Sequence, residues 1–266
     1  MIPALFLSHG SPMIFLDQTP AHDFLVHLSE ITGRPKAIVV ISAHWETQGF
    51  QVMGTEHPKT IYDFGGFDPR LYHLTYPAAG DPALAERIVA CLSGHQIAAS
   101  LNTTRGLDHG AWIPLLLAFP QADIPVLQIS VPKVATPRMM FDLGRALARL
   151  REENILIIGS GSFTHNLYEF TGQDVAAVPE PWVVAFADWM HEKLAAGDIE
   201  SLLDYRRLAP FARENHPTEE HILPLFAALG AGVGMDGDLR DETIVESLHH
   251  SYNHAILAMD AYAFGG

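Results

Sequence analysis

The stretch Ile38-Val39-Val40-Ile41-Ser42-Ala43-His44-Trp45 sets the class of the fold, because branched apolar residues run unbroken into a serine and a histidine. Such a run without polar alternation is typical of a strand covered on both faces of its sheet. Runs of this kind predict buried strands over 3–7, 37–41, 124–129 and 155–158. Residues 50–53 and 95–101 are weaker strand candidates.

Helical patterns lie between these strands, and we expect helices over 20–32, 82–94, 110–118, 137–150, 181–195 and 218–229. Asp81-Pro82 supplies a cap and a first turn for the second of them. Alternating strands and helices predict an α/β fold, here a single-domain α/β/α sandwich with a largely parallel or mixed central sheet. Without an internal repeat or a Ser/Gly linker, residues 1–266 are interpreted as one domain.

The charge balance excludes several classes of partner. The 266 residues include 31 acidic and 16 basic side chains, which gives a formal net charge of −15. Nucleic acids and anionic membranes attract clustered Lys and Arg, so neither is expected as the main partner. No apolar stretch approaches the roughly 20 residues of a membrane span, and the first residues lack the basic start of a signal peptide. We therefore expect a cytoplasmic protein.

Histidine is abundant and cysteine is nearly absent, with 15 His and one Cys. The single Cys91 allows neither an internal disulfide nor a Cys-based zinc site. A metal site would therefore consist of imidazole and carboxylate groups. Imidazole suits this role because it is neutral near pH 7 and is the commonest metal ligand.

Three histidines follow three of the predicted strands. His9 and His44 come within about two residues of their strands, whereas His165 follows 155–158 after a segment rich in Gly and Ser. Ligands of open α/β sheets bind outside the carboxyl ends of the strands, where such side chains converge. Each histidine alone could be an isolated polar turn residue, but three such positions in one chain favour a shared site.

His221 is a fourth candidate, at the start of the last predicted helix. Thr218 has the character of an N-cap, and Glu219 and Glu220 then occupy the first turn, where they complement the helix dipole. His221 becomes the third helical residue, with its side chain directed back toward the N-terminal end. The spacing differs from the His-Glu-x-x-His motif of zinc proteases, so that class is unsupported.

His109 is a fifth candidate, in a segment that also contains Gly106, Asp108 and Gly110. The glycines permit a close approach of the backbone to a ligand. Asp108 can orient the imidazole or cap the following helix, and a cap alone is a serious alternative.

Six short motifs occur in order along the chain, at 7–12 (LSHGSP), 41–45 (ISAHW), 61–67 (IYDFGGF), 107–112 (LDHGAW), 162–167 (SFTHNL) and 220–225 (EHILPL). Each motif alone is weak. Together they resemble the class III (LigB-type) extradiol ring-cleavage dioxygenases, in the branch similar to DOPA 4,5-dioxygenase. The resemblance extends from residue 3 to about residue 230.

This resemblance implies a non-haem Fe(II) enzyme that opens the ring of a catechol with O₂. His9 and His44 match metal ligands of the family, and His221 stands where relatives with a two-His, one-carboxylate triad carry a glutamate. Three imidazoles also suit zinc, so Zn²⁺ is a plausible occupant of the same site. His165 matches the acid/base histidine, which can also approach the metal, and His109 matches a histidine on the substrate side.

The family chemistry gives the loop at 61–67 a role. Tyr62, Asp63 and Phe64 are expected to form a lid or an aromatic wall against the catechol, although a loop packed for its own sake is an equal alternative. A catechol that binds through both oxygens needs adjacent open metal positions, which three ligands on one side of the ion leave. A histidine with a pKa near neutrality can take a catechol proton and return it later.

Two other functions stay open on the sequence alone. A zinc hydrolase built from the same histidines would need Glu46 or Glu219 as a base, and its ester hydrolysis would not depend on oxygen. A non-enzymatic interaction protein of the same fold would retain no metal.

A substrate carboxylate has three candidate partners, Arg105, Lys133 and Arg138. The sequence leaves open the substrate, the native metal, the oligomeric state (a homo-oligomer included) and the role of His249, His250 and His254.

Overall fold

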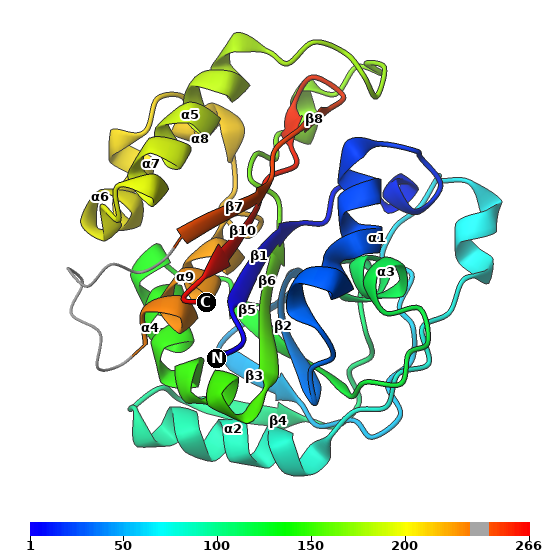
Figure 1. The fold of residues 1–266 in the computed structure, drawn as a ribbon, viewed down its shortest axis with the longest axis vertical. Coiled ribbons are helices and arrows are strands. Elements are labelled where there is room, and N and C mark those ends of the chain that lie inside the picture. Colours follow the sequence, from blue (N-terminus) through cyan, green and yellow to red (C-terminus); the bar gives the residue numbers. More distant parts are fainter. Residues whose placement is uncertain (235–244) are drawn as a thin grey trace.

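A computed structural model describes residues 1–234 and 245–266, and a mixed sheet of eight strands forms the centre of this described part (Figure 1). Across the sheet the strands are β4 (Ala99–Asn102), β3 (Phe50–Met53), β5 (Val126–Pro132), β2 (Ala37–Thr47), β6 (Ile155–Gly161), β1 (Ala4–Ser8), β10 (Ala261–Phe264) and β7 (Val245–His249). The short strands β8 (Tyr252–Asn253) and β9 (Leu257–Ala258) pair separately.

The centre of the sheet is parallel. Strands β5, β2, β6 and β1 run in one direction, with Ile38 beside Leu156 and Leu5 beside Ile158. Strand β10 is antiparallel to β1, and β3 is antiparallel to β5. The carboxyl ends of β1, β2 and β6 therefore lie side by side at one edge, as the sequence predicted.

Helices cover both faces of the sheet. They are α1 (Pro20–Thr32), α2 (Pro82–Gly94), α3 (His109–Ala118), α4 (Pro137–Leu147), α5 (Pro181–Ala195), α6 (Ile199–Leu203), α7 (Tyr205–Leu208), α8 (Ala212–Asn215) and α9 (Leu223–Val233), with 3-10 turns η1 (Pro12–Phe15), η2 (Pro69–His73), η3 (Ala148–Glu153) and η4 (Leu167–Glu169). Helices α1 and α3 pack on one face, and α2, α4 and α9 pack on the other (Figure 1). This arrangement confirms the predicted α/β/α sandwich.

Alternate side chains of the central strands divide between two hydrophobic cores. Val39 and Ile157 point into the core under α4 and α9, whereas Val40 and Ile158 point into the core under α1 and α3. Burial on both faces explains why these strands lack polar alternation. Within the described ranges, no helix has both the length and the apolar character to cross a membrane.

The last predicted helix, 218–229, begins later than expected. Helix α9 starts at Leu223, with Pro224 in its first turn, and Thr218 does not cap it. The His221 carbonyl accepts a hydrogen bond from the Ser162 backbone N–H at 2.9 Å, which holds this segment against the end of β6 instead of in a helix. Glu219 and Glu220 therefore do not lie in the first turn, and the expected dipole effect is absent from α9.

Candidate metal centre

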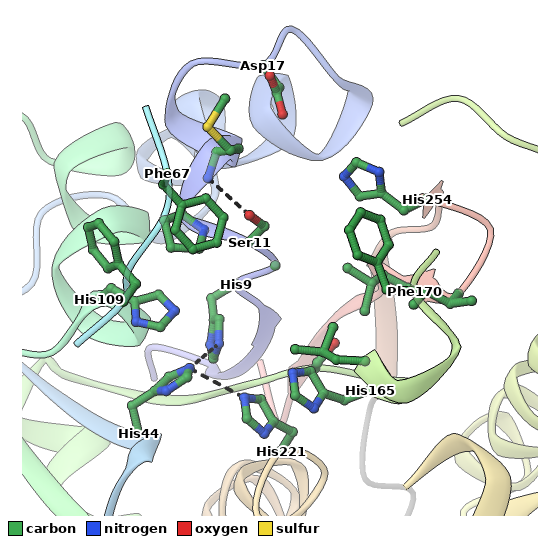
Figure 2. A pocket seen from close by; sticks show the side chains of 18 residues that line it. His9, Ser11, Asp17, His44, Phe67, His109, His165, Phe170, His221 and His254 are labelled. Atoms are coloured by element: carbon green, nitrogen blue, oxygen red, sulfur yellow. Dashed lines mark hydrogen bonds between the residues drawn. The ribbon is translucent and has the colours of Figure 1, made fainter. Parts of the chain in front are cut away.

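Five histidines meet at the carboxyl edge of the sheet, and one of them, His109 at the start of α3, has its ring centroid 3.9 Å from that of His44 (Figure 2). His9 directly follows β1, His165 follows β6, and His221 precedes α9. His44 lies inside β2, which continues to Thr47 beyond the predicted end of the strand. The pairing of β2 with β5 is irregular between Ile41 and Glu46, and such an irregularity redirects side chains in a strand.

Three of the imidazoles direct the same nitrogen toward one point. The Nε2 atom of His44 lies 3.0 Å from Nε2 of His9 and 3.3 Å from Nε2 of His221. The ring centroids of His9 and His221 are 5.6 Å apart. Gly110 of α3 completes this packing, because a Cβ there would lie 3.0 Å from the His44 ring and 3.2 Å from the His9 ring.

Hydrogen bonding at the opposite nitrogen sets the tautomer of His9. The Ser160 hydroxyl donates to the Gly110 carbonyl and therefore accepts from Nδ1–H of His9 at 2.9 Å. This leaves Nε2 of His9 with a free lone pair. Metal-bound histidines are oriented in the same way, by a partner on the nitrogen that does not bind the ion.

Carboxylates hold the other imidazoles. Nδ1 of His221 lies 2.9 Å from Glu220, and Asp63 lies 3.5 Å from Nδ1 of His44 and 3.0 Å from Nδ1 of His109. Asp63 also accepts the backbone N–H of His109 at 2.9 Å. Asp63 therefore accepts the hydrogen bond at the start of α3 that capping by Asp108 would have provided.

Asp108 instead belongs to a buried polar group behind the site. Its carboxylate accepts hydrogen bonds from Ser42, Gln128 and Arg105, and it makes no side-chain cap on α3. Arg105 also donates to the carbonyl of His44. This group fixes the backbone of β2 at the point from which His44 projects.

Burial keeps the clustered imidazoles neutral. It lowers the pKa of His9 and His221 well below the usual value, and the neighbouring histidines act in the same direction. Burial and the charge of His109 also lower the pKa of His44, to about 4. Neutral imidazoles with free lone pairs that converge on one point are suited to a divalent metal ion. The residues present therefore fit the metal that the sequence implied.

His165 has a different relation to the cluster. Its ring stacks on the ring of His221 with centroids 3.5 Å apart and planes inclined by only 7°. An imidazole binds a metal in the plane of its ring, so one ion cannot lie in both of these parallel planes. The stacking favours His221 as the ligand and His165 as a neighbour that faces the same cavity.

A cavity of about 510 Å³ opens above the histidines. Phe64, Phe67, Phe170 and Met13 form apolar parts of its wall, and Asp17 and His254 lie at the end away from His44 (Figure 2). Phe170 and Asp17 were not predicted as site residues, because they lie in loops and belong to none of the six motifs.

Tyr62 and Asp63 lie behind Phe64 rather than at the surface of this cavity. The Tyr62 hydroxyl donates to the Leu74 carbonyl at 2.6 Å, and its ring packs against Trp112 and Phe64. In the described part of the chain they support the wall, while Phe64 and His109 line it. Contact of Tyr62 and Asp63 with a substrate stays a prediction.

The groups that a hydrolase would need lie elsewhere. Glu219 accepts a hydrogen bond from the Tyr205 hydroxyl at 2.7 Å, and the side chain of Glu46 is exposed. Two candidate partners of a substrate carboxylate also lie away from the site: Arg138 pairs with Glu200 on the surface, and Lys133 is exposed. The cavity formed by the described residues is lined by none of these side chains.

A cluster of imidazoles under an aromatic cavity, at the carboxyl edge of a mixed sheet, defines a metal-dependent enzyme for small aromatic compounds. Residues 3–265 match the family described as the catalytic LigB subunit of aromatic ring-opening dioxygenase. The chain belongs to this LigB family, and it is an extradiol dioxygenase that cleaves aromatic rings.

Relatives and a solved structure agree with this assignment. The chain is 42% identical to a 4,5-DOPA dioxygenase extradiol of Beta vulgaris, covering 97% of this chain and 95% of the relative. A 4,5-DOPA dioxygenase extradiol of Escherichia coli (strain K12) is 40% identical, over 88% and 87% of the two chains. The crystal structure of the uncharacterized protein JW3007 from Escherichia coli K12 superposes with a TM-score of 0.80 at 34% identity and covers both chains completely.

Proposed function

We propose that this dioxygenase opens the ring of DOPA or a closely related catechol, with His9, His44 and His221 as the ligands of an Fe²⁺ ion. The observation that carries the proposal is the convergence of three Nε2 atoms, 3.0 and 3.3 Å apart, below an aromatic cavity. Relatives with 35–42% identity are named 4,5-DOPA dioxygenase extradiol, which supports this substrate class.

His9, His44 and His221 all line the cavity, so an ion that they held would face the space open to substrate. When bound, Fe²⁺ would supply adjacent positions for a catechol and for O₂, favour loss of the catechol protons and allow electrons to pass from the catechol, which is oxidised, to O₂. Zn²⁺ fits the same imidazoles but has no redox chemistry. We therefore expect Zn²⁺ to bind without ring opening.

His165 is the proposed proton acceptor. Burial lowers its pKa, so the imidazole is neutral near pH 7 and is able to take a hydroxyl proton from the catechol. The ring lines the cavity beside His221 without sharing its plane. His165 can then return the proton to the opened product.

His109 and the aromatic wall position the substrate. Nδ1 of His109 faces Asp63 at 3.0 Å, so Nε2 is the nitrogen available to a catechol oxygen. Phe64 and Phe67 form an apolar surface on which an aromatic ring can pack and from which water is excluded. Asp17, at the far end of the cavity, has the charge to meet the ammonium group of DOPA.

Reconstitution with a chosen metal tests the proposal. Protein stripped with a chelator is loaded with Fe²⁺ or Zn²⁺ and given DOPA or 4-methylcatechol, while oxygen uptake and the visible absorbance of the product are recorded. We expect one O₂ per DOPA consumed with Fe²⁺ and none with Zn²⁺. His44→Ala should retain no metal at the site and show no uptake, whereas His95→Ala, which removes an exposed imidazole, should match the wild type.

The outcomes separate the parts of the proposal. Oxygen uptake with 4-methylcatechol but not with DOPA would overturn the substrate. Metal retention by His44→Ala equal to that of the wild type would overturn the ligand set. Ester hydrolysis unaffected by anaerobic conditions, without uptake on any catechol, would contradict the proposed reaction itself.

A further inference from the structure

A second cluster of metal-binding side chains lies away from the catalytic cavity, between α5 and the C-terminal strands. His191 comes from α5, His250 directly follows β7, and Asp260 directly precedes β10. Nε2 of His191 lies 2.7 Å from Oδ1 of Asp260, and Nδ1 of His250 lies 2.8 Å from the same oxygen. The two nitrogens are 3.2 Å apart. Three donor atoms from three separate segments thus surround one point.

We propose that His191, His250 and Asp260 form a second site for a divalent transition-metal ion, with Zn²⁺ as its probe. Two imidazoles and one carboxylate are a donor set that binds zinc and other first-row metals. Donor atoms 2.0–2.1 Å from one ion lie about 3.0–3.4 Å from each other. The distances of 2.7, 2.8 and 3.2 Å need only a small expansion.

The carboxylate is built into the protein in a way that suits a ligand. The side chain of Asp260 is 0% exposed, and its Oδ2 atom is buried without a hydrogen-bond partner among the described residues. Both imidazoles approach Oδ1, so only one of the two carboxylate oxygens has a partner. A buried carboxylate of this kind is costly without further positive charge, which a metal ion provides.

The surroundings of His191 match those of a metal-bound histidine. The Tyr262 hydroxyl is hydrogen-bonded to Nδ1 of His191, on the side away from Asp260. When a metal occupies Nε2, the ring proton belongs on Nδ1, where Tyr262 accepts it. His250 is half-exposed, with 44% of its side chain accessible, so an ion can enter from solvent and the ring can move outward.

Electrostatics at the cluster favours a cation. Asp260 contacts both imidazoles, and Asp188 is near enough for its negative charge to act on His250. Asp188 lies on α5 one turn before His191. The opposing strands and α5 thus present two carboxylates to this point.

Counting bound zinc in paired variants tests the site independently of catalysis. The wild type, His250→Ala and a control, His27→Ala, are saturated with Zn²⁺, passed through a desalting column and analysed by mass spectrometry of the metal. His27 is exposed on α1 and far in sequence from the cluster. We expect His250→Ala to carry one zinc fewer per chain than the other two. Equal zinc in His250→Ala and His27→Ala would overturn the proposal.

A second measurement removes the catalytic site from the comparison. In a His44→Ala background we expect Co²⁺ to give a visible ligand-field spectrum with one equivalent bound, and we expect Zn²⁺ to raise the melting temperature. Both signals should disappear in His44→Ala/His250→Ala and in His44→Ala/Asp260→Asn, which keeps the shape of the carboxylate. Absence of Co²⁺ binding in the His44→Ala protein, or its persistence in both double variants, would contradict the second site whatever the catalytic cavity binds.

Discussion

Ser160 shows how a single hydroxyl directs a candidate ligand. It is buried in β6 and connects the Gly110 carbonyl to Nδ1 of His9, so that Nε2 of His9 faces the other imidazoles. Sequence patterns predicted His9 as a ligand from its place after a strand. They did not predict Ser160, because a buried serine in a strand has no distinctive spacing.

Removal of this hydroxyl should weaken metal binding without removing a ligand. In Ser160→Ala, Nδ1 of His9 loses its partner and the ring can adopt either tautomer, so we expect a 10–100-fold rise in the Kd for Zn²⁺. Competition with a chromophoric chelator measures this constant. The matched control is Ser130→Ala, which should leave the Kd unchanged. Ser130 is a buried residue of β5 whose hydroxyl accepts hydrogen bonds from Thr47 and from the Gln51 backbone N–H. An unchanged Kd in Ser160→Ala would show that this hydroxyl does not orient His9.

His165 should affect the reaction more than the binding of the metal. Its ring is parallel to that of His221 and 3.5 Å away, so the two cannot hold one ion in their planes. We expect His165→Ala to keep its metal and to bind a catechol, while ring opening falls by about 10²-fold or more. Metal analysis together with single-turnover absorbance would separate the two effects. If the variant lost its metal as completely as His44→Ala, His165 would be a ligand.

Helices α4 and α9 cross at unusually short range because each carries a glycine at the contact. A Cβ on Gly144 would lie 1.9 Å from the Ala227 carbonyl oxygen, and a Cβ on Gly230 would lie 2.0 Å from that of Phe141. The helices therefore touch backbone to backbone. Helix α9 also packs on β6 and β1, so this contact determines how closely the segment that carries His221 approaches the sheet.

A methyl group at this crossing should be costly. We expect Gly144→Ala to lower the free energy of unfolding by about 1–3 kcal/mol, because the helices must separate. Urea denaturation of the metal-free protein measures the loss. Gly94→Ala, at the end of α2 with nothing within 4 Å of the new Cβ, should be neutral or slightly stabilising. Equal stability of the two variants would contradict the close contact.

Local signals were sufficient for some elements and not for others. Helices α1, α2 and α5 have the bounds expected from the sequence, since each begins with a proline in its first turn, and Thr19 and Asp81 cap α1 and α2. The predicted start of the last helix, at residue 218, was wrong, because a tertiary hydrogen bond from Ser162 to the His221 carbonyl overrides the expected cap at Thr218. Strands β7 and β10 were not predicted. They are short, and β10 joins the sheet through β1, which lies more than 250 residues earlier at Ala4–Ser8.

Acid should destabilise the whole molecule through its buried histidines. Burial lowers the pKa of His216 to about 3, and burial also lowers the pKa values of His9, His44, His165 and His221. An unfolded histidine takes up a proton below about pH 6.5, whereas these native ones resist it. The unfolded state thus binds more protons, so their contribution is complete above pH 6.5 and is lost as the pH falls.

The size of this effect can be measured at His216, which lies outside the proposed metal ligands. We expect His216→Gln to reduce the slope of unfolding free energy against pH by about 1.4 kcal/mol per pH unit between pH 6 and pH 4. Urea titrations of the chelator-treated protein at several pH values provide the slope. His95→Gln, with an exposed ring, should not change it. A slope in His216→Gln equal to that of His95→Gln would show that His216 is protonated in the native state.

The order of the strands has a consequence for synthesis. Strand β1 is translated before both of its partners, β6 and β10, and Nε2 of His44 lies 3.3 Å from Nε2 of His221, which comes 177 residues later in the chain. Contacts that are so distant in sequence form slowly, because a long loop must close before any of them contributes. A nascent chain therefore carries β1 as an unpaired apolar segment until β6 and β10 have been made. With the ligand set proposed above, all three imidazoles become available to a metal ion only once His221 has been translated.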